Sequence, residues 1–212
     1  MSNWNSGYIT DINYTYGYYT MLNPLHMQLA FLNQGLIYPK VTTACELGYG
    51  QGISVNILAA TSNVEWYGTD FNPAQASFAQ EFGMVSGAKL FDDSFEEFAN
   101  RTDLPDFDFI ATHGIWSWIA PEHKKQILDF VKRKLKVGGV FYISYNTYPG
   151  WSSFAPVRHL LAQYTDQMAS KGRGILENVD DSLNFVNRLF ENEPAYCRLN
   201  PIVAERLKDL KK

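Results

Sequence analysis

Cysteine is scarce in this sequence of 212 residues: only Cys45 and Cys197 are present, and they lie far apart. Because they form no C-x-x-C pair, the sequence indicates neither a disulfide framework nor a zinc site, and we expect no bound metal. Long apolar runs are also missing, since none approaches the ~20 residues that span a bilayer. The first residues lack the basic start and apolar core of a signal peptide. We therefore expect a soluble, cytoplasmic protein with no membrane partner.

Positive charge is in the minority as well, because 18 basic residues against 22 acidic residues give a net charge of −4. This balance argues against general affinity for nucleic acids, and we expect no nucleic-acid partner. One basic cluster lies on and just after a predicted helix. Basic residues near the C-terminus of a helix are more typical of a solvent-exposed helix face than of a surface that binds phosphates. The members of the cluster are Lys124, Lys125, Lys132, Arg133, Lys134 and Lys136.

Three glycines at alternate positions mark the stretch on which the functional interpretation depends. The uncharged run 41–45 predicts a buried parallel strand, and it leads to Glu46 and then to Gly48, Gly50 and Gly52. Glycine at these positions permits a tight turn and lets the backbone approach a ligand closely. An apolar segment follows as the predicted helix. In open α/β sheets, ligands bind at this end of the strands.

The spacing of these glycines separates the nucleotide-binding classes. A dinucleotide fingerprint needs G-x-G-x-x-G, and a phosphate-binding loop needs G-x-x-x-x-G-K-[ST]; this stretch has neither. Its pattern, E-x-G-x-G-x-G, resembles motif I of the Rossmann-like S-adenosylmethionine-dependent methyltransferases. A carboxylate at the strand end suits a cofactor with an ammonium group and a sulfonium better than a pyrophosphate. A glycine turn without a ligand is the alternative.

A second acid supports this interpretation. The run Val64 to Asp70 predicts the second strand, and Asp70 follows Glu46 by 24 positions (70 − 46). This is close to the distance at which a β-α-β unit places its ribose-binding carboxylate. We expect Asp70→Ala to weaken cofactor binding at least tenfold and barely to move the melting temperature without ligand. Asp93 and Ser94 resemble the loop that contacts adenine in the methyltransferases, whereas Ser94 with Glu97 also forms a capping box.

Five short β-prone segments predict the strands of the sheet, and helical patterns lie between them. We predict an α/β fold: a Rossmann-like methyltransferase sheet, mostly parallel, with helices on both faces. After Tyr145 no strand pattern follows, so a C-terminal helical segment stands in place of the last hairpin of such sheets. The predicted strands are 41–47, 64–70, 88–92, 107–113 and 140–145.

Proline, asparagine and glycine set the expected helix boundaries. Asn23-Pro24 and Asn72-Pro73 are typical of helix starts, and Gly83 is the expected end of the second of these helices. A third helix is expected from Pro121 to about Lys134. Three more are expected at 154–171, 180–190 and 202–210. A leucine stripe with helical spacing follows Pro24, consisting of Leu25, Leu29, Leu32 and Leu36.

The sequence predicts three parts. Residues 1–40 form an aromatic arm and a helix, 41–151 the S-adenosylmethionine-binding core, and 152–212 a helical segment that leads to a further C-terminal region. The arm either buries its rings on the sheet edge or forms a lid over the cofactor. Because the fifth strand would expose its outer edge, we expect a second copy of the chain or the C-terminal region to cover it.

Residues 14–212 as a whole resemble a bacterial group of methyltransferases whose cofactor domain is joined to a methyltransferase regulatory domain. The resemblance implies S-adenosyl-L-methionine as cofactor and a protein or small molecule as methyl acceptor. Some members of the group methylate protein lysines. The segments that carry the resemblance are Gly17-Tyr18-Tyr19, Ala44 to Gly52, Tyr67 to Pro73, Asp92 to Phe95, His113 to Trp118 and Ser144 to Trp151.

The candidate site residues follow from these motifs. Catalytic candidates are His113, Asn146 and Tyr148, although a lone histidine after a strand is more often a partner of backbone groups. Aromatic rings after the fourth and fifth strands suit an amine acceptor, although each could equally be core. The acceptor-side residues are Trp116, Trp118, Asn146, Tyr148 and Trp151. The cofactor-side residues are Tyr19, Glu46, Gly48, Tyr49, Gly50, Gly52, Asp70, Phe71, Asn72, Asp93, Ser94, Phe95, His113 and Gly114.

Three classes of function therefore remain at this point. The leading interpretation is a methyltransferase that acts on protein lysines, with a small-molecule O- or N-methyltransferase as its alternative. A module that binds the cofactor without turnover is the second class. A nicotinamide oxidoreductase is the third, and the glycine spacing disfavours it.

Overall fold

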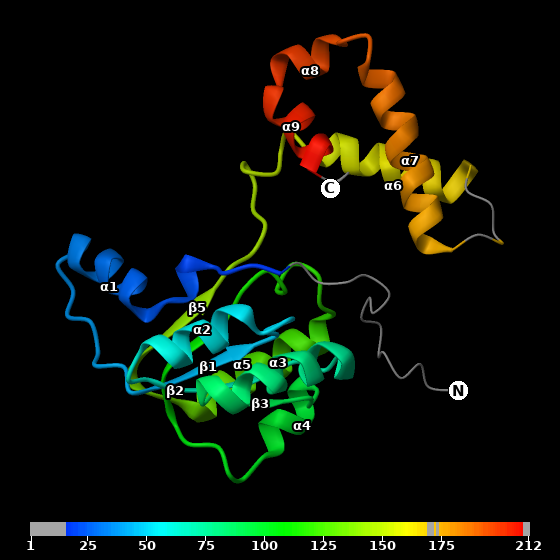
Figure 1. The fold of residues 1–212 in the computed structure, drawn as a ribbon. Coiled ribbons are helices and arrows are strands. Elements are labelled where there is room, and N and C mark those ends of the chain that lie inside the picture. The colour runs from blue at the N-terminus through cyan, green and yellow to red at the C-terminus, as the bar shows by residue number, and fades with distance from the viewer. Residues whose placement is uncertain (1–15, 169–171, 173, 210–212) are drawn as a thin grey trace. The chain divides into compact units, whose positions relative to one another are not determined.

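Figure 1 shows the computed structural model of the chain, which describes residues 16–168, 172 and 174–209. The chain divides into two compact units, Met1–Tyr145 and Asn146–Lys212, and each is described by itself. Most of the predicted aromatic arm lies outside the described residues. None of the helices in the described part of the chain is long and apolar enough to cross a membrane.

A five-stranded sheet organises the first unit, with all strands parallel and in the order β3-β2-β1-β4-β5. This confirms the predicted α/β fold. β1 lies at the centre, so the chain leaves it for β2 on one side, while β4 pairs on the other side. The strand bounds are β1 (Thr43–Leu47), β2 (Glu65–Thr69), β3 (Lys89–Phe91), β4 (Phe107–Thr112) and β5 (Leu135–Ile143).

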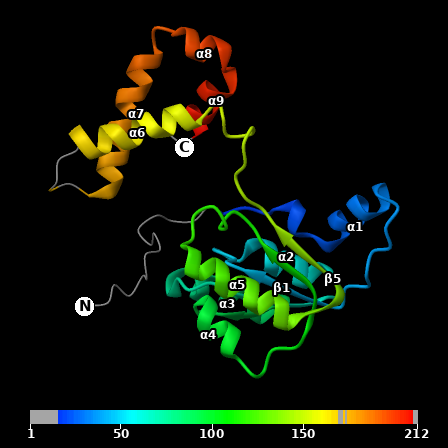
Figure 2. The ribbon, with the colours of Figure 1, turned by 180° about the vertical axis from the view of Figure 1, so that it is seen from behind.

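Helices cover both faces of this sheet, as Figures 1 and 2 show from opposite sides. Side chains alternate along each strand, so Ala44 and Cys45 of β1 enter different cores. Ala44 packs with α2 (Ile53–Thr61) and α3 (Pro73–Ser86). Cys45 packs with α4 (Phe95–Asn100) and α5 (Pro121–Lys134). Because both faces are covered, the strands can be apolar without alternation.

Two short N-terminal elements lie on the α2 side of the sheet. They are η1 (Thr20–Leu22), whose Leu22 is fully buried, and α1 (Pro24–Asn33). The Asn23 side chain accepts a hydrogen bond from the Leu25 backbone N–H at 2.9 Å, which confirms the expected helix start. The leucine stripe does not face this core, because Leu25, Leu29, Leu32 and Leu36 are all exposed.

Two boundaries differ from the expectation. α3 does not end at Gly83 but continues to Ser86, and Gly87 with φ +81° ends it. Gly83 is needed for packing, because a Cβ there would lie 3.0 Å from the Ala88 carbonyl oxygen. β5 begins at Leu135, five positions before the expected start at 140, so Gly138 and Gly139 lie within the strand. The pairing of β5 with β4 is irregular between Phe107 and Phe109, where a bulge accommodates the extra residues.

The second unit is helical, as predicted after Tyr145. Its helices are α6 (Ala155–Met168), α7 (Ile175–Phe190), α8 (Ala195–Leu199) and α9 (Pro201–Asp209). α7 begins five positions before the expected Asp180, and the short α8 was not expected. The core of the unit is apolar and consists of Phe154, Val157, Leu183, Val186, Val203 and Leu207.

The two edges of the sheet are β3 and β5. β5 pairs only with β4 among the described residues, so its outer edge carries backbone groups without a strand partner. The expectation that a second copy or a C-terminal region covers this edge stays a prediction.

Candidate cofactor-binding site

The glycine loop after β1 has the backbone that its sequence predicts. Gly48, Gly50 and Gly52 have φ values of +76°, +58° and +68°, in the left-handed region that favours glycine. At Gly52 space is limiting too, because a Cβ would lie 2.5 Å from the Cβ of Ala79 on α3. The loop thus turns tightly and packs α2 against α3 at the carboxyl end of the sheet.

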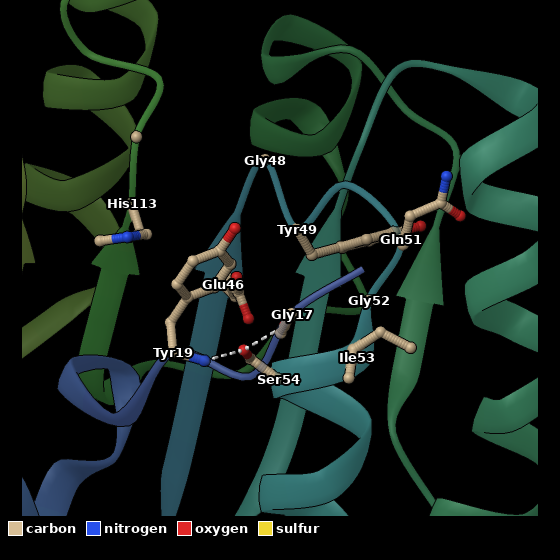
Figure 3. A pocket seen from close by; sticks show the side chains of 11 residues that line it. Gly17, Tyr19, Glu46, Gly48, Tyr49, Gln51, Gly52, Ile53, Ser54 and His113 are labelled. Carbon is tan, nitrogen blue, oxygen red and sulfur yellow. Dashed lines mark hydrogen bonds between the residues drawn. The ribbon is translucent and has the colours of Figure 1, made fainter. Parts of the chain in front are cut away.

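A cavity of about 210 Å³ opens beside this loop (Figure 3). It lies between β1 and β4, where the strand order reverses, which is the point at which open α/β sheets bind ligands. The structure brings seven of the fourteen residues predicted for the cofactor into its wall. They are Tyr19, Glu46, Gly48, Tyr49, Gly52, His113 and Gly114.

Glu46 is the main charged group of this wall. Its side chain is 4% exposed, and Oε2 has no hydrogen-bond partner among the described residues. Burial, and to a smaller extent the charge of Asp70, raises its pKa to about 8. A buried carboxylate oxygen without a partner is costly in an isolated domain. An ammonium group in the cavity would supply the missing partner, so Glu46 fits the amino-acid end of S-adenosylmethionine.

Asp70 lies next to the glycine loop but does not line the cavity. Its Oδ2 accepts a hydrogen bond from the Gly50 N–H at 2.8 Å, and its Oδ1 accepts one from the Asn72 N–H at 3.0 Å. Burial raises its pKa to about 6, although these two bonds oppose the rise. The carboxylate therefore holds the loop in shape, which the spacing argument did not include. Each oxygen keeps a second lone pair for a ribose hydroxyl.

A segment that precedes η1 closes one side of the cavity. The Tyr19 N–H donates to Ser54 Oγ at 2.9 Å, and Ser54 Oγ contacts the Gly17 carbonyl oxygen at 3.4 Å (Figure 3). Ser54 is 3% exposed although it lies in the first turn of α2. These bonds fix the Tyr19 ring at the cavity wall, and its centroid lies 4.7 Å from that of His113.

His113 follows β4 directly and is the only imidazole in the cavity wall. Its Nδ1 lies 3.2 Å from the Tyr142 hydroxyl oxygen on β5. The two rings are stacked, with centroids 6.1 Å apart and an interplanar angle of 18°. Burial lowers the pKa of His113 below its ordinary value, which favours the neutral imidazole at pH 7.

The residues predicted for adenine contact are engaged elsewhere in the first unit. The Asp93 carboxylate forms an ion pair with Arg101, and the Arg101 guanidinium lies 3.9 Å from the Phe91 ring centroid. The Ser94 N–H donates to Glu97 Oε2 at 2.9 Å, so the capping box is present. Three further predicted residues lie nearby outside the cavity wall: Phe71, Asn72, which caps α3, and the buried Phe95.

The predicted acceptor side is divided between the two units. In the first unit, Trp118 is 62% exposed, whereas Trp116 packs against the α5-side core with Lys124 Nζ 5.7 Å from its ring centroid. In the second unit, the Arg206 guanidinium lies 4.8 Å from the Trp151 ring centroid. Trp151 thus already has a cation over its ring, while Tyr148 is exposed.

Four residues of the cavity wall were missed by the sequence analysis: Gly17, Gln51, Ile53 and Ser54. A signal was available for Ser54, since it is a polar residue in the first turn of an otherwise apolar helix. The assignment of cofactor and acceptor roles to individual residues stays a prediction.

The fold and the cavity together define a class. A parallel sheet with a glycine-rich loop after its central strand, a buried acid at that strand's end and a second acid after β2 is typical of Rossmann-like methyltransferases. The buried Glu46 carboxylate and the close glycine backbone fit S-adenosylmethionine.

Comparisons with known proteins support this class. Residues 45–143 match the family model described as "Methyltransferase domain". The protein sll1526 of Synechocystis is 41% identical over 98% of this chain and 42% of its own length. RP789 of Rickettsia prowazekii is 28% identical over 78% of this chain and 32% of its own length. This chain thus spans less than half the length of either relative.

A solved structure is similar across both units. PKMT2 from Rickettsia typhi, in complex with AdoHcy, has a TM-score of 0.70 at 20% identity and covers 94% of this chain and 38% of its own. Residues 45–143 thus carry the match to the methyltransferase domain, and the likeness to PKMT2 shows the same Rossmann-like fold; both support S-adenosylmethionine as the predicted cofactor. The predicted likeness to the group with a regulatory domain stays a prediction.

Proposed function

We propose that this protein transfers the methyl group of S-adenosylmethionine to the amino group of lysine side chains in proteins. The observation that carries the transferase part is the Glu46 carboxylate, buried at the cavity with Oε2 unpartnered among the described residues. A carboxylate there binds the ammonium group of the cofactor and orients its methionine half. The glycine loop lets the backbone approach the cofactor without side chains in between.

The sulfonium of the cofactor supplies an activated methyl group, so the protein mainly has to align the acceptor and exclude water. Tyr19 and His113 form a half-buried aromatic wall at the end of β4. Such a wall desolvates an amine, which lowers its pKa toward the neutral nucleophile. It also tolerates the methylated cation that results.

The lysine part rests on the likeness to PKMT2, whose name denotes a protein lysine methyltransferase. That likeness covers both units of this chain. Trp118, in the segment that follows β4, is exposed and is therefore also suited to contact a macromolecular surface. A small-molecule O- or N-methyltransferase and a binding module without turnover are the alternatives that the experiment separates.

The test is incubation of the protein with methyl-deuterated S-adenosylmethionine and a mixture of bacterial proteins, followed by mass spectrometry. We expect labelled lysines with the wild type. Glu46→Gln should give far less label, whereas the exposed Glu81→Gln on α3 serves as the matched control. Label found only on small molecules would overturn the lysine assignment. Cofactor binding without any label would favour the binding module.

A further inference from the structure

We propose that the Tyr19 ring stabilises the positively charged sulfonium of S-adenosylmethionine and not the neutral sulfur of S-adenosylhomocysteine, and that Ser54 is the positioning residue that holds this ring at the cavity. The ring then favours the methyl donor over the product in the competition for the site. This inference rests on the proposed methyl transfer, in which the cofactor loses its positive sulfur charge together with its methyl group.

The hydroxyl group of Ser54 holds a strap formed by residues 17–19. Ser54 Oγ accepts a hydrogen bond from the Tyr19 N–H at 2.9 Å and donates its own hydrogen to the Gly17 carbonyl oxygen at 3.4 Å. The Tyr19 carbonyl oxygen accepts a hydrogen bond from the N–H of Leu22, a fully buried residue, at 3.0 Å. The backbone of Tyr19 is thus held through both its N–H and its carbonyl group, so the ring is in place at the cavity before a ligand binds.

The cavity that the Tyr19 ring lines is suited to a cation. Of the described residues that line it, Glu46 is the one with a carboxylate, and none is lysine or arginine. The ring of His113 lies beside that of Tyr19, with its centroid 4.7 Å away, and burial lowers the pKa of His113, which favours the neutral imidazole at pH 7. No cationic side chain among these residues therefore opposes a sulfonium.

The position of Glu46 indicates where the sulfur would lie. Its carboxylate is near the end of β1 and is the group proposed to bind the ammonium of the cofactor. Only a short aliphatic chain separates ammonium and sulfur in the cofactor, so both would occupy this cavity of about 210 Å³, which Tyr19 and Glu46 line together (Figure 3). We therefore expect the sulfur to lie within about 6 Å of the Tyr19 ring centroid, the range over which a π face attracts a cation.

The chemistry of the sulfur explains why a ring can distinguish the two ligands. A sulfonium has no hydrogen on its sulfur and cannot donate a hydrogen bond from it, so the groups that stabilise it are carboxylates and the negative faces of aromatic rings. After methyl transfer the sulfur is neutral, and the attraction to the ring is lost while the shape of the ligand changes little. Because Ser54 already holds the strap, little of this attraction is offset by the cost of ordering the ring.

The first experiment measures the dissociation constants of both ligands by calorimetry, without a methyl acceptor. In Tyr19→Leu, the dissociation constant of S-adenosylhomocysteine divided by that of S-adenosylmethionine should fall roughly 5- to 30-fold, the range of a desolvated cation–π contact. Tyr19→Phe keeps a π face, so this ratio should stay within about twofold of the wild type. The matched control is Tyr16→Leu, because the Tyr16 ring packs against Phe78 and does not line the cavity.

A Tyr19→Leu variant that binds both ligands more weakly by the same factor would overturn the proposal. A ring that only shapes the cavity acts on both ligands alike, because they differ little in shape. The melting temperatures of the variants without ligand report whether each variant is folded.

The second experiment tests Ser54 and keeps the proposal testable if Tyr19→Leu does not fold. Ser54→Ala removes the hydroxyl group and leaves the ring in the chain. Hydrogen exchange of the Tyr19 amide should become faster, and the ratio of the two dissociation constants should fall at least roughly threefold, since a loosened ring spends less time beside the sulfur. The control is Thr61→Ala on the same helix, whose hydroxyl donates to the Ile57 carbonyl oxygen at 2.7 Å. An unchanged amide exchange or an unchanged ratio in Ser54→Ala would exclude Ser54 as the positioning residue.

These outcomes are distinct from those of the labelling experiment. If lysines are labelled and the ratio does not respond to the ring, only this inference fails. If the ratio responds as expected and no lysine is labelled, the lysine assignment fails and this inference stands. A wild type that binds neither ligand would overturn both.

Discussion

Glu46 should couple cofactor binding to the release of a proton. With its pKa raised to about 8 by burial, Glu46 is largely protonated at pH 7 in the protein without ligand. An ammonium group of the cofactor favours the carboxylate, so binding at pH 7 should expel close to one proton. The dissociation constant should then fall by up to about tenfold per unit of pH between 6 and 8, since one proton leaves for each cofactor bound.

Replacing Glu46 by Gln removes the charge and keeps the shape. A hydrogen bond to a charged group contributes about 1.5–3 kcal/mol, and each 1.4 kcal/mol is about tenfold in affinity, so the dissociation constant should rise roughly 10- to 150-fold. Its dependence on pH below 8 should disappear. Glu81→Gln, on the exposed face of α3, should leave both affinity and pH dependence unchanged.

The stability of the protein without ligand should fall as pH rises, whereas its affinity for the cofactor should increase. A folded-state pKa above the unfolded value of 4.5 means that the folded chain binds more protons between pH 4.5 and 8. The contribution of Glu46 is therefore complete below about pH 4.5 and is lost as pH rises toward 8, at roughly 1 kcal/mol per unit of pH. Glu46→Gln removes this loss, so the variant should melt higher than the wild type at pH 8.

Calorimetry in two buffers with different ionisation enthalpies counts the protons released on binding S-adenosylhomocysteine, and thermal melts at pH 5 and 8 give the stability. The reasoning about Glu46 fails if the wild type releases no proton at pH 7. It also fails if Glu46→Gln binds as tightly as the wild type at pH 8.

Three further predictions follow from the loop and the sheet edge. Asp70→Ala should weaken cofactor binding at least tenfold. Contrary to the expectation from sequence, it should also lower the melting temperature without ligand, because the Gly50 and Asn72 N–H groups each lose an acceptor worth about 1–3 kcal/mol. An unchanged melting temperature would show that these two hydrogen bonds do not stabilise the loop. Gly52→Ala should lower the free energy of unfolding, measured by chemical denaturation, by roughly 2–5 kcal/mol, because alanine disfavours the left-handed φ and its Cβ clashes with Ala79. Gly87→Ala also has a left-handed φ but open space around it, so it should lower the same free energy by only about 1–2 kcal/mol. Equal losses in the two variants would contradict the role of packing at Gly52. We also propose that a second copy or a C-terminal region covers the outer edge of β5. Hydrogen exchange of the β5 amides that slows at higher protein concentration would identify the second copy. Exchange that is rapid at every concentration would exclude the second copy.

The sequence alone determined the features that are local in the chain. A β-prone run, an acid and three glycines specify a strand and a turn with φ above zero, because only glycine adopts that backbone at little cost. Helix starts at Asn23 and Asn72 follow in the same way, since each side chain bonds a backbone N–H two positions away. These local preferences, with buried apolar strands, were sufficient to predict the sheet, while the cofactor was predicted from the resemblance of the glycine pattern to the methyltransferases.

Contacts between distant residues were decided only by the tertiary structure. The Ser54 hydroxyl accepts a hydrogen bond from the Tyr19 N–H, 35 positions away in the sequence. His113 Nδ1 contacts the hydroxyl of Tyr142, which is 29 positions away. The leucine stripe has helical spacing, but spacing does not show whether a face will find a partner, and here it stays exposed. The carboxylate of Asp70 holds the glycine loop, and the ring of Trp151 carries Arg206. Such pairings depend on which surfaces the folded chain brings together, and no local pattern contains that information.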